Sequence, residues 1–204
     1  MIQKPLIQIV DLAHQYGTHR VFQHISFDIF PASICLITGP SGVGKTTLLS
    51  LIGGIVAPQS GYIQLDPILL PRERGFGYAL IDGPFFETLS VLENILLLES
   101  FSGMTIDQEF LRELMEYFEI ELLTSQSVIS LSVGQRERVN FVRALVHRPR
   151  VVILDEPGAN LDARLFEKLI AYLQRKNSGI AYVIVSHDTR FLAIASEHIT
   201  LNSL

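Results

Sequence analysis

The 204-residue sequence contains a single cysteine, Cys35, and no apolar run as long as a membrane span requires. One cysteine excludes an intramolecular disulfide, so the chain suits a reducing compartment such as the cytosol. A helix that crosses a bilayer needs about 18 or more apolar residues, and charged residues interrupt the longest stretches here. Residues 1–11 carry Lys4 and Pro5, and nothing among them resembles a signal peptide. These absences favour a globular protein without a membrane span of its own.

Positive charge is also scarce. The sequence has 16 Lys and Arg against 21 Asp and Glu, and its net charge is -5. Since a broad electrostatic grip on nucleic acid or on an anionic membrane needs the opposite balance, we expect no nucleic-acid partner. We find no internal repeat and no low-complexity linker. With 48% hydrophobic residues and a mean hydropathy of +0.33, the chain can bury a large core as one domain, 1–204, and still present an apolar docking surface.

The sequence does contain a complete phosphate-binding pattern. The motif G-x-x-x-x-G-K-[ST] is filled at every fixed position by Gly39-Pro40-Ser41-Gly42-Val43-Gly44-Lys45-Thr46. Its three glycines let the backbone turn tightly and bring N–H groups against an anion, and Lys45 adds a mobile positive charge. The apolar run 34–37 predicts a buried strand before the loop, and 46–52 predicts the helix after it, which includes Thr47. We therefore expect phosphates to bind at the N-terminus of that helix.

The remaining apolar patterns predict an α/β fold of the P-loop NTPase type. An N-terminal antiparallel β part is expected from strands at 6–12, 25–30 and 61–65, with a turn at 14–17 and another strand at 75–81. The second half alternates continuously apolar strands with helices, which favours a mostly parallel sheet. Its expected strands are 151–154, 181–185 and one near the C-terminus, and its expected helices are 132–147, 161–176 and a short one before the last strand.

Residues 91–130 have the periodicity of helices. Apolar side chains such as Val91, Ile95, Leu111 and Leu114 recur at i, i+3 and i+4 spacing. This pattern predicts an inserted helical subdomain at about 85–135 within the single domain. Its Leu-rich face is expected to be ordinary core packing, with a partner-docking face as the alternative.

Three of the predicted strands end in chemically active groups. In an open parallel sheet ligands bind beyond the carboxyl ends of the strands, so the phosphate loop, Asp155-Glu156 and His187 are expected to meet. Thr46 and Asp155 are candidates to hold Mg²⁺, and Glu156 is a candidate to polarise an attacking water. This set is sufficient for ATP hydrolysis, because the protein supplies positioning and electrostatics in phosphoryl transfer. Taken singly, an acidic pair often belongs to a helix cap, and a lone histidine is more often structural.

With these groups the sequence resembles the ATP-binding cassette family across almost the whole chain. The resemblance adds a signature motif at Leu131-Ser132-Val133-Gly134-Gln135, a Walker B pair at Asp155-Glu156, a D-loop at Ala159-Asn160-Leu161-Asp162, a switch histidine at His187 and an adenine-stacking aromatic at Tyr16. Segment 156–162 is most similar to the subgroup of lipoprotein-release, macrolide-export and cell-division ATPases. Ser132 with Gln135 also forms a capping box, so the signature segment could be only a helix start.

The resemblance implies a Mg²⁺-dependent ATPase whose active site one chain cannot complete. In the family two cassettes form a head-to-tail homodimer, and the signature motif of one subunit closes over ATP on the phosphate loop of the other. The resemblance thus implies roles in ATP binding for Ser132, Gly134, Gln135, Asp162 and Tyr16, and in catalysis for Lys45, Glu156 and His187. The implied partner is an integral membrane permease, with the chain peripheral on the cytoplasmic face of the inner membrane.

Two positions depart from the family pattern. Ile81 stands where the family has a glutamine that contacts Mg²⁺ or water, followed by Asp82, and Val133 stands at a signature position usually occupied by glycine. A β-branched side chain restricts close approach to phosphate. These departures keep open a second function, a regulatory or structural module with slow or no turnover. A soluble ATP-switched module acting on DNA or ribosomes is a third, although the acidic balance disfavours it.

Overall fold

The computed structural model describes residues 4–81, 84–175 and 179–202. Two sequence-based expectations concern residues outside these ranges. They are Asp82, which follows the departure at Ile81, and Lys176, the expected last residue of a helix.

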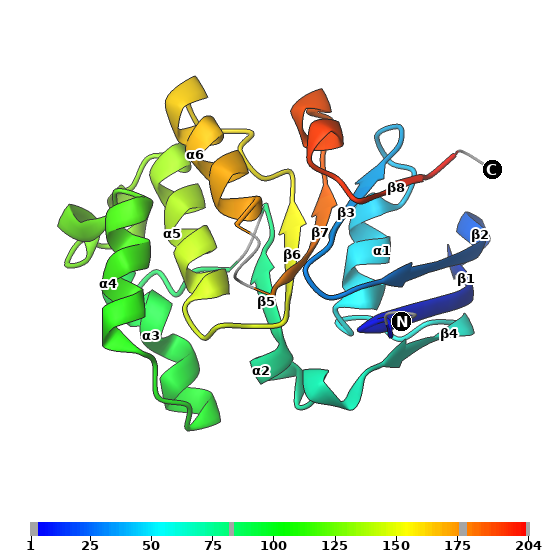
Figure 1. Cartoon of the computed structure of the whole chain (residues 1–204), viewed down its shortest axis with the longest axis horizontal. Coiled ribbons are helices and arrows are strands. Elements are labelled where there is room, and N and C mark those ends of the chain that lie inside the picture. Colours follow the sequence, from blue (N-terminus) through cyan, green and yellow to red (C-terminus); the bar gives the residue numbers. More distant parts are fainter. Residues whose placement is uncertain (1–3, 82–83, 176–178, 203–204) are drawn as a thin grey trace.

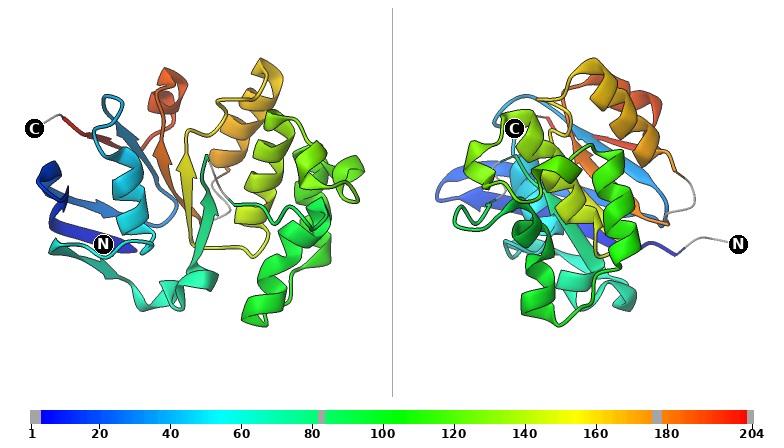
Figure 2. Two further views of the ribbon diagram at one scale, coloured as in Figure 1. Left: turned by 180° about the vertical axis from the view of Figure 1, so that it is seen from behind. Right: turned by 90° about the vertical axis from the view of Figure 1, so that its left-hand side faces the viewer.

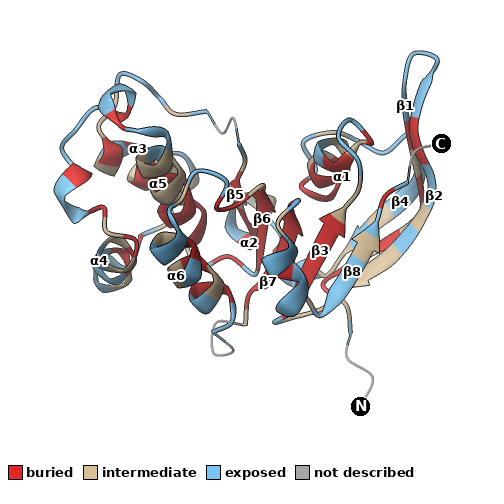
Figure 3. Ribbon diagram, turned by 90° about the horizontal axis from the view of Figure 1, so that it is seen from above, coloured by how far each residue is buried: buried red, intermediate tan, exposed pale blue. Residues whose placement is uncertain are grey.

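Five parallel strands form the main sheet (Figure 1). Their order is β5 (Phe76–Ala79), β6 (Val151–Asp155), β7 (Ala181–Val185), β3 (Ile34–Thr38) and β8 (Glu197–Thr200). Every residue of β6 and β7 is buried, as the continuous apolar runs predict for strands covered on both faces (Figure 3). The predicted α/β fold with a parallel sheet is confirmed, and all carboxyl ends of these strands lie at one edge.

A smaller antiparallel sheet is formed by β2 (His19–Ile29), β1 (Ile7–Tyr16) and β4 (Ser60–Leu65), with β1 in the middle. The expected turn at 14–17 is wrong, because β1 continues to Tyr16 and the chain turns at Gly17 and Thr18. Register shifts between Ile9 and His14 interrupt the two-residue alternation, so the pattern hides the second half of the strand. The strand expected at 75–81 is shorter than predicted, as β5 ends at Ala79.

The two faces of the parallel sheet are covered by different elements. Helix α1 (Lys45–Ile52) packs with the antiparallel sheet on one face, and α5 (Val133–Leu145) and α6 (Ala163–Leu173) cover the other. Three short elements complete this part of the fold: η1 (Pro67–Leu69), α2 (Arg72–Gly75) and η5 (Thr189–Ala193). The helices expected at 132–147 and 161–176 are each present with shorter bounds.

Residues 91–130 are helical, as predicted. They form α3 (Val91–Ser102), α4 (Gln108–Tyr117), η2 (Glu121–Leu123) and η3 (Val128–Ser130), on the far side of the parallel sheet from the antiparallel one (Figure 2). Their apolar side chains share one core with α5, α6 and the sheet, so most of the Leu-rich face is core packing. The limits of an inserted subdomain at 85–135 stay a prediction. Within the described ranges, no helix has the length and apolar character to cross a bilayer.

Candidate nucleotide site

The phosphate loop connects β3 to α1, and its glycines are required by its shape. Gly39, Gly42 and Gly44 have φ of 149, 78 and 102°. A Cβ at Gly44 would collide with Val21, and a Cβ at Gly39 would lie 2.5 Å from the carbonyl oxygen of Leu201. A Cβ at Gly42 would meet no atom within 4 Å, so this part of the loop faces open space. The N–H groups at the N-terminus of α1, which follows the loop, are therefore left accessible to an anion.

Lys45 is buried at the start of α1. Its Nζ donates hydrogen bonds to the carbonyl oxygens of Gly39 and Pro40, each at 2.9 Å. The loop backbone thus holds the ammonium group within the curve of the phosphate loop, where it is suited to pair with an anion.

The acidic pair follows β6. Thr46 Oγ1 donates to Asp155 Oδ2 at 3.2 Å, which brings the first turn of α1 to the end of β6. A hydroxyl and a carboxylate side by side are hard oxygen donors of the kind that Mg²⁺ prefers, so the two residues fit this cation. Glu156 has a φ of 47°, a left-handed conformation that is uncommon for a residue with a side chain.

The Glu156 carboxylate is oriented by the end of β7. The backbone N–H of His187 donates to Glu156 Oε2 at 3.1 Å, and His187 Nε2 lies 3.5 Å from Glu156 Oε1. The backbone N–H of Glu156 in turn donates to the carbonyl of Val185 at 2.8 Å. Neighbouring strands β6 and β7 therefore hold the two side chains together at the carboxyl edge of the sheet.

These groups line one cavity of about 310 Å³, which we call the nucleotide cavity. It brings together most of the phosphate loop, the acidic pair and the histidine, as the strand-end argument predicts: Ser41, Gly42, Gly44, Lys45, Thr46, Thr47, Asp155, Glu156 and His187. Ile81 lies in the same wall and is 61% exposed. An apolar side chain there cannot donate to phosphate or bind a metal.

Other candidate residues lie outside this cavity. Val43 is buried in the core, and Tyr16 is 56% exposed at the end of β1, with its ring 4.8 Å from that of His14. Asp162 caps α6 by accepting from the N–H of Leu165 at 2.8 Å. A structural role therefore accounts for the contacts of Asp162 within the chain.

The signature segment begins α5, also outside the nucleotide cavity. Ser132 Oγ accepts from the N–H of Gln135 at 3.2 Å, and the Gln135 side chain accepts from the N–H of Ser132 at 2.8 Å. The predicted capping box is confirmed. A Cβ at Gly134 would lie 2.6 Å from the carbonyl oxygen of Asn160, so glycine is needed here for packing within the chain. Val133 is 61% exposed beside it.

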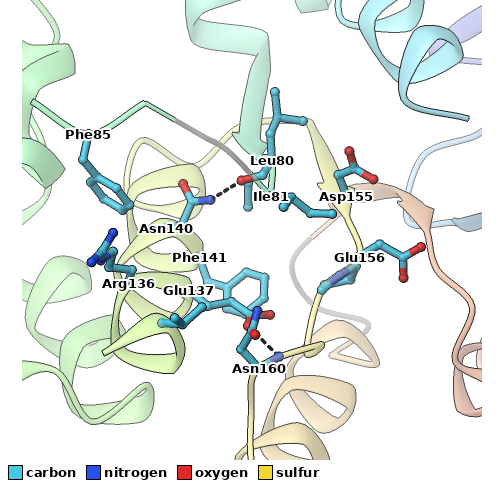
Figure 4. Close-up of a pocket in the computed structure, with 13 residues that line it drawn as sticks. Leu80, Ile81, Phe85, Arg136, Glu137, Asn140, Phe141, Asp155, Glu156 and Asn160 are labelled. Atoms are coloured by element: carbon cyan, nitrogen blue, oxygen red, sulfur yellow. Dashed lines mark hydrogen bonds between the residues drawn. The ribbon is translucent and has the colours of Figure 1, made fainter. Parts of the chain in front are cut away.

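A second cavity, of about 380 Å³, separates α5 from the ends of β5 and β6 (Figure 4). Ile81 lines both this cavity and the nucleotide cavity. Glu137, one turn beyond Gly134, accepts from the backbone N–H groups of Gly158 and of Asn160, the latter at 3.0 Å. Burial raises the pKa of Glu137. This glutamate ties α5 to the segment that follows the acidic pair.

Two further α5 side chains hold the segment after β5. Asn140 Nδ2 donates to the carbonyl of Leu80 at 2.9 Å, and Arg143 donates to Pro84 O at 2.7 Å and to Asn140 Oδ1 at 2.8 Å. Arg143 also stacks over Phe85 at 4.5 Å, and burial lowers its pKa to about 10. Sequence reasoning missed Glu137, Asn140 and Arg143, although their i, i+3, i+6 spacing puts three polar residues on one face of a helix that is otherwise packed against apolar side chains.

Comparison with known proteins identifies the family. A model described as ABC transporter matches residues 22–159. The chain belongs to the ABC transporter family. Similar curated proteins include the spermidine/putrescine import ATP-binding protein PotA of Legionella pneumophila, 32% identical over 97% of this chain and 56% of the relative, and that of Thermotoga maritima, 33% identical over 96% and 55%. The sulfate/thiosulfate import ATP-binding protein CysA of Mesostigma viride is 32% identical over 97% and 59%.

Solved structures agree on the fold. The dimeric structure of MJ0796, a bacterial ABC transporter cassette, has a TM-score of 0.85 and 25% identity, covering 96% of this chain and 94% of that one. An ATP-binding subunit of an ABC transporter also has a TM-score of 0.85, at 22% identity. This ABC-family chain therefore matches a cassette over nearly its full length, whereas it spans little more than half the length of the curated relatives.

Proposed function

We propose that this chain is the ATP-binding and ATP-hydrolysing subunit of an ABC transporter-type membrane complex, acting on the cytoplasmic face of the membrane. The observation that carries the proposal is the nucleotide cavity, where the phosphate loop, the Thr46–Asp155 contact and the Glu156–His187 pair meet. The names of the PotA and CysA relatives, import ATP-binding proteins, support it. The likeness of segment 156–162 to the lipoprotein-release, macrolide-export and cell-division subgroup stays a prediction.

In hydrolysis, each side chain of the cavity has a distinct role. Lys45 exchanges its bonds to the loop carbonyls for bonds to phosphate oxygens. The water oxygen forms a bond to the terminal phosphorus while the bond to the ADP oxygen breaks, and Glu156 accepts the water proton. His187 keeps the Glu156 carboxylate in place. Mg²⁺ held by Thr46 and Asp155 would neutralise charge on the phosphates.

We further propose that the active form is a head-to-tail homodimer. Ser132, Gly134 and Gln135 lie outside the nucleotide cavity of their own chain, and the start of α5 is a helix N-terminus suited to an anion. A second copy could supply that anion as the ATP on its own phosphate loop. The dimeric cassette among the similar structures supports this arrangement.

An integral membrane permease would dock on an apolar cavity of about 330 Å³ formed by β5, α3 and α5. Ile95, Leu97, Leu98 and Phe101 of α3 line it, and Phe101 is 77% exposed. Ile95 is buried and Leu97 and Leu98 are half-buried, so the exposed Phe101 ring and the apolar cavity beside it are what mark an interaction surface. ATP-driven closure of two cassettes would then move the permease segments seated in this cavity.

The decisive experiment compares the steady-state ATPase rate of the wild-type chain with that of Glu156→Gln. We expect the rate to fall about 100-fold or more, because a positioned base contributes on the order of 10² to 10⁴, while ATP affinity is retained. Glu197→Gln, on the exposed strand β8, makes the same charge change away from the cavity and should leave the rate unchanged. Equal rates for wild type and Glu156→Gln would remove Glu156 from catalysis.

Ile81 favours one alternative, a regulatory or structural subunit that binds ATP with little turnover. Its apolar side chain occupies a wall of the nucleotide cavity where a polar group could hold water. The same rate measurement separates the two functions. Wild-type turnover well above that of Glu156→Gln supports the transporter ATPase. A second experiment identifies the partner: Glu156→Gln purified in the presence of Mg-ATP should bring with it a stoichiometric membrane protein.

A further inference from the structure

A histidine is buried in the antiparallel sheet without a hydrogen-bond partner. His14, in β1, is 5% exposed, and neither Nδ1 nor Nε2 of its ring bonds to any residue among 4–81, 84–175 and 179–202. A neutral imidazole carries one N–H donor and one acceptor nitrogen, so both are left unsatisfied away from water. Unmade hydrogen bonds of this kind cost free energy, which an apolar side chain of similar size would avoid. The contacts within the chain therefore give no reason for a histidine at this position.

The neighbours of His14 are aromatic. The Tyr16 ring lies 4.8 Å from the imidazole, with an angle of 77° between the two ring planes. Phe22, which pairs with His14 across β1 and β2, has its ring 6.4 Å away. We call these three residues the aromatic cluster. Tyr16 is 56% exposed whereas Phe22 is buried, so the cluster meets solvent at Tyr16.

The aromatic cluster lies beside the phosphate loop. A Cβ at Gly44 would lie 3.3 Å from Cδ1 of Phe22, and Gly44 also lines the nucleotide cavity. Contacts therefore run from the cavity wall through Phe22 to His14 and on to Tyr16. A nucleotide joins its base to its phosphates through one sugar, so phosphates on the loop would keep the base close by. The exposed ring of Tyr16 offers that base a flat surface for stacking.

We propose that His14 recognises the base of the bound nucleotide by a hydrogen bond to a ring nitrogen of that base. The inference rests on the proposed nucleotide site and adds a specificity residue to it. Exposed side chains change rotamer rapidly, so a base that stacks on Tyr16 can shift this ring and uncover the edge of the imidazole. Binding would then give His14 the hydrogen-bond partner that its surroundings in the chain do not provide.

The chemistry of the cluster suits a base better than a phosphate. A base has an aromatic face that stacks on Tyr16 and acceptor nitrogens at its edge for a neutral N–H donor. A phosphate group has no face to stack, and the loop with Lys45 already provides for it.

Calorimetric titrations of the full chain with ADP and with inorganic pyrophosphate separate base binding from phosphate binding. Neither ligand is consumed by ATP hydrolysis. We expect His14→Leu to weaken ADP binding about tenfold, the affinity that one hydrogen bond of typical strength contributes, and to leave pyrophosphate binding unchanged. Without ligand, the same variant should melt about 2 to 4 °C higher than wild type, because it no longer buries unpaired nitrogens. A gain in stability together with a loss in affinity excludes misfolding as the cause.

Two further variants complete the test. His147→Leu makes the same change in a half-buried imidazole that lines the cavity of β5, α3 and α5, and it should leave ADP affinity unchanged. His14→Gln keeps a donor and an acceptor, so it should bind ADP within about threefold of wild type.

Three outcomes would overturn the role of His14: unchanged ADP affinity in His14→Leu, equal weakening of ADP and pyrophosphate, or a loss in His14→Gln as large as in His14→Leu. Failure of the proposed nucleotide site gives a different result, since the wild-type chain would then bind neither ligand, and this inference would fall with it.

Discussion

At the scale of single residues, Glu137 positions the start of α5, a role that its place in the sequence does not indicate. Its carboxylate accepts from the N–H groups of Gly158 and Asn160, two residues of the segment between the acidic pair and α6. The same segment approaches Gly134 through the carbonyl of Asn160. Both contacts fix the start of α5 against the loop that follows Glu156, so the proposed signature residues and the proposed base are positioned by one contact network.

Glu137→Gln should destabilise the fold, although glutamine has nearly the same size and shape as glutamate. A glutamine has one acceptor oxygen, so its NH₂ group would face one of the two backbone N–H groups and leave that donor unpaired. We expect a loss of about 1 to 3 kcal/mol in the free energy of unfolding, measured by urea denaturation. Glu116→Gln, exposed on α4, is the control with the same charge change. A loss no larger than that of the control would mean that the two contacts contribute nothing to stability.

At the scale of elements, α5 holds the segment after β5 through Arg143. One guanidinium bonds Pro84 O and Asn140 Oδ1 and stacks on Phe85, and Asn140 reaches Leu80 O. The helix that starts at the signature residues is thereby connected to the segment beside Ile81. Movement of either element would be transmitted to the other.

Arg143→Lys tests this connection. A lysine keeps the charge but cannot bond both oxygens with one planar group, so we expect a loss of about 1 to 2 kcal/mol. Amide hydrogen exchange should become faster in residues 84–90 and stay unchanged in α6. Arg112→Lys on the exposed face of α4 is the control. Unchanged exchange in residues 84–90 would show that Arg143 does not restrain them.

The segment just after α4 is linked to α6 by an ion-pair cluster with a defined pH dependence. Glu119 bonds Arg164 and Lys168, and these partners lower its pKa from its usual 4.5 to about 2. A carboxyl with a lowered folded-state pKa contributes stability that is present above pH 4.5 and is lost as the pH falls toward 2. With its side chain 35% exposed, we expect Glu119→Gln to cost about 1 kcal/mol at pH 7 after solvent screening. The difference from wild type in urea denaturation should vanish near pH 2, and a difference that persists there would assign the stability to something other than the ion pairs.

Local sequence patterns predicted the features that depend on only one segment of the chain. The phosphate loop, the buried strands β3, β6 and β7 and the Ser132–Gln135 capping box follow from spacing and apolar runs. The full length of β1 could not be predicted, because register shifts around Leu12 interrupt its alternation. The roles of Gly134 and Arg143 depend on what lies across the fold from them, Asn160 and Pro84, and a sequence alone does not place those partners.

At the scale of the whole molecule, the nucleotide cavity and the start of α5 are separate places suited to an anion. The carboxyl edge of the parallel sheet carries the phosphate loop and the acidic pair, which line the nucleotide cavity. The start of α5 is the second such place, and it does not line the nucleotide cavity of its own chain. The proposed head-to-tail dimer gives this helix start a ligand.

The variant Val133→Asp tests the proposed dimer without destabilising the fold. Val133 is the first residue of α5 and is 61% exposed, and an acidic side chain at a helix N-terminus stabilises the helix by about 0.3 to 1 kcal/mol. In the proposed dimer the new carboxylate would face the phosphates held by the other copy and repel them. We therefore expect thermal stability to be kept while ATP-dependent dimerisation, followed by sedimentation, is lost. Val133→Ala, which adds no charge, should still dimerise.

Mixing two inactive variants tests the head-to-tail geometry itself. Val133→Asp damages the signature segment and Lys45→Ala damages the phosphate loop, so a mixed dimer keeps one complete site, formed by the intact half of each chain. Random pairing of a symmetric dimer puts half of the molecules in mixed pairs, each with one of two sites, so up to about a quarter of the wild-type ATPase rate should return on mixing. If each chain hydrolyses ATP with its own α5, the mixture stays as inactive as its components.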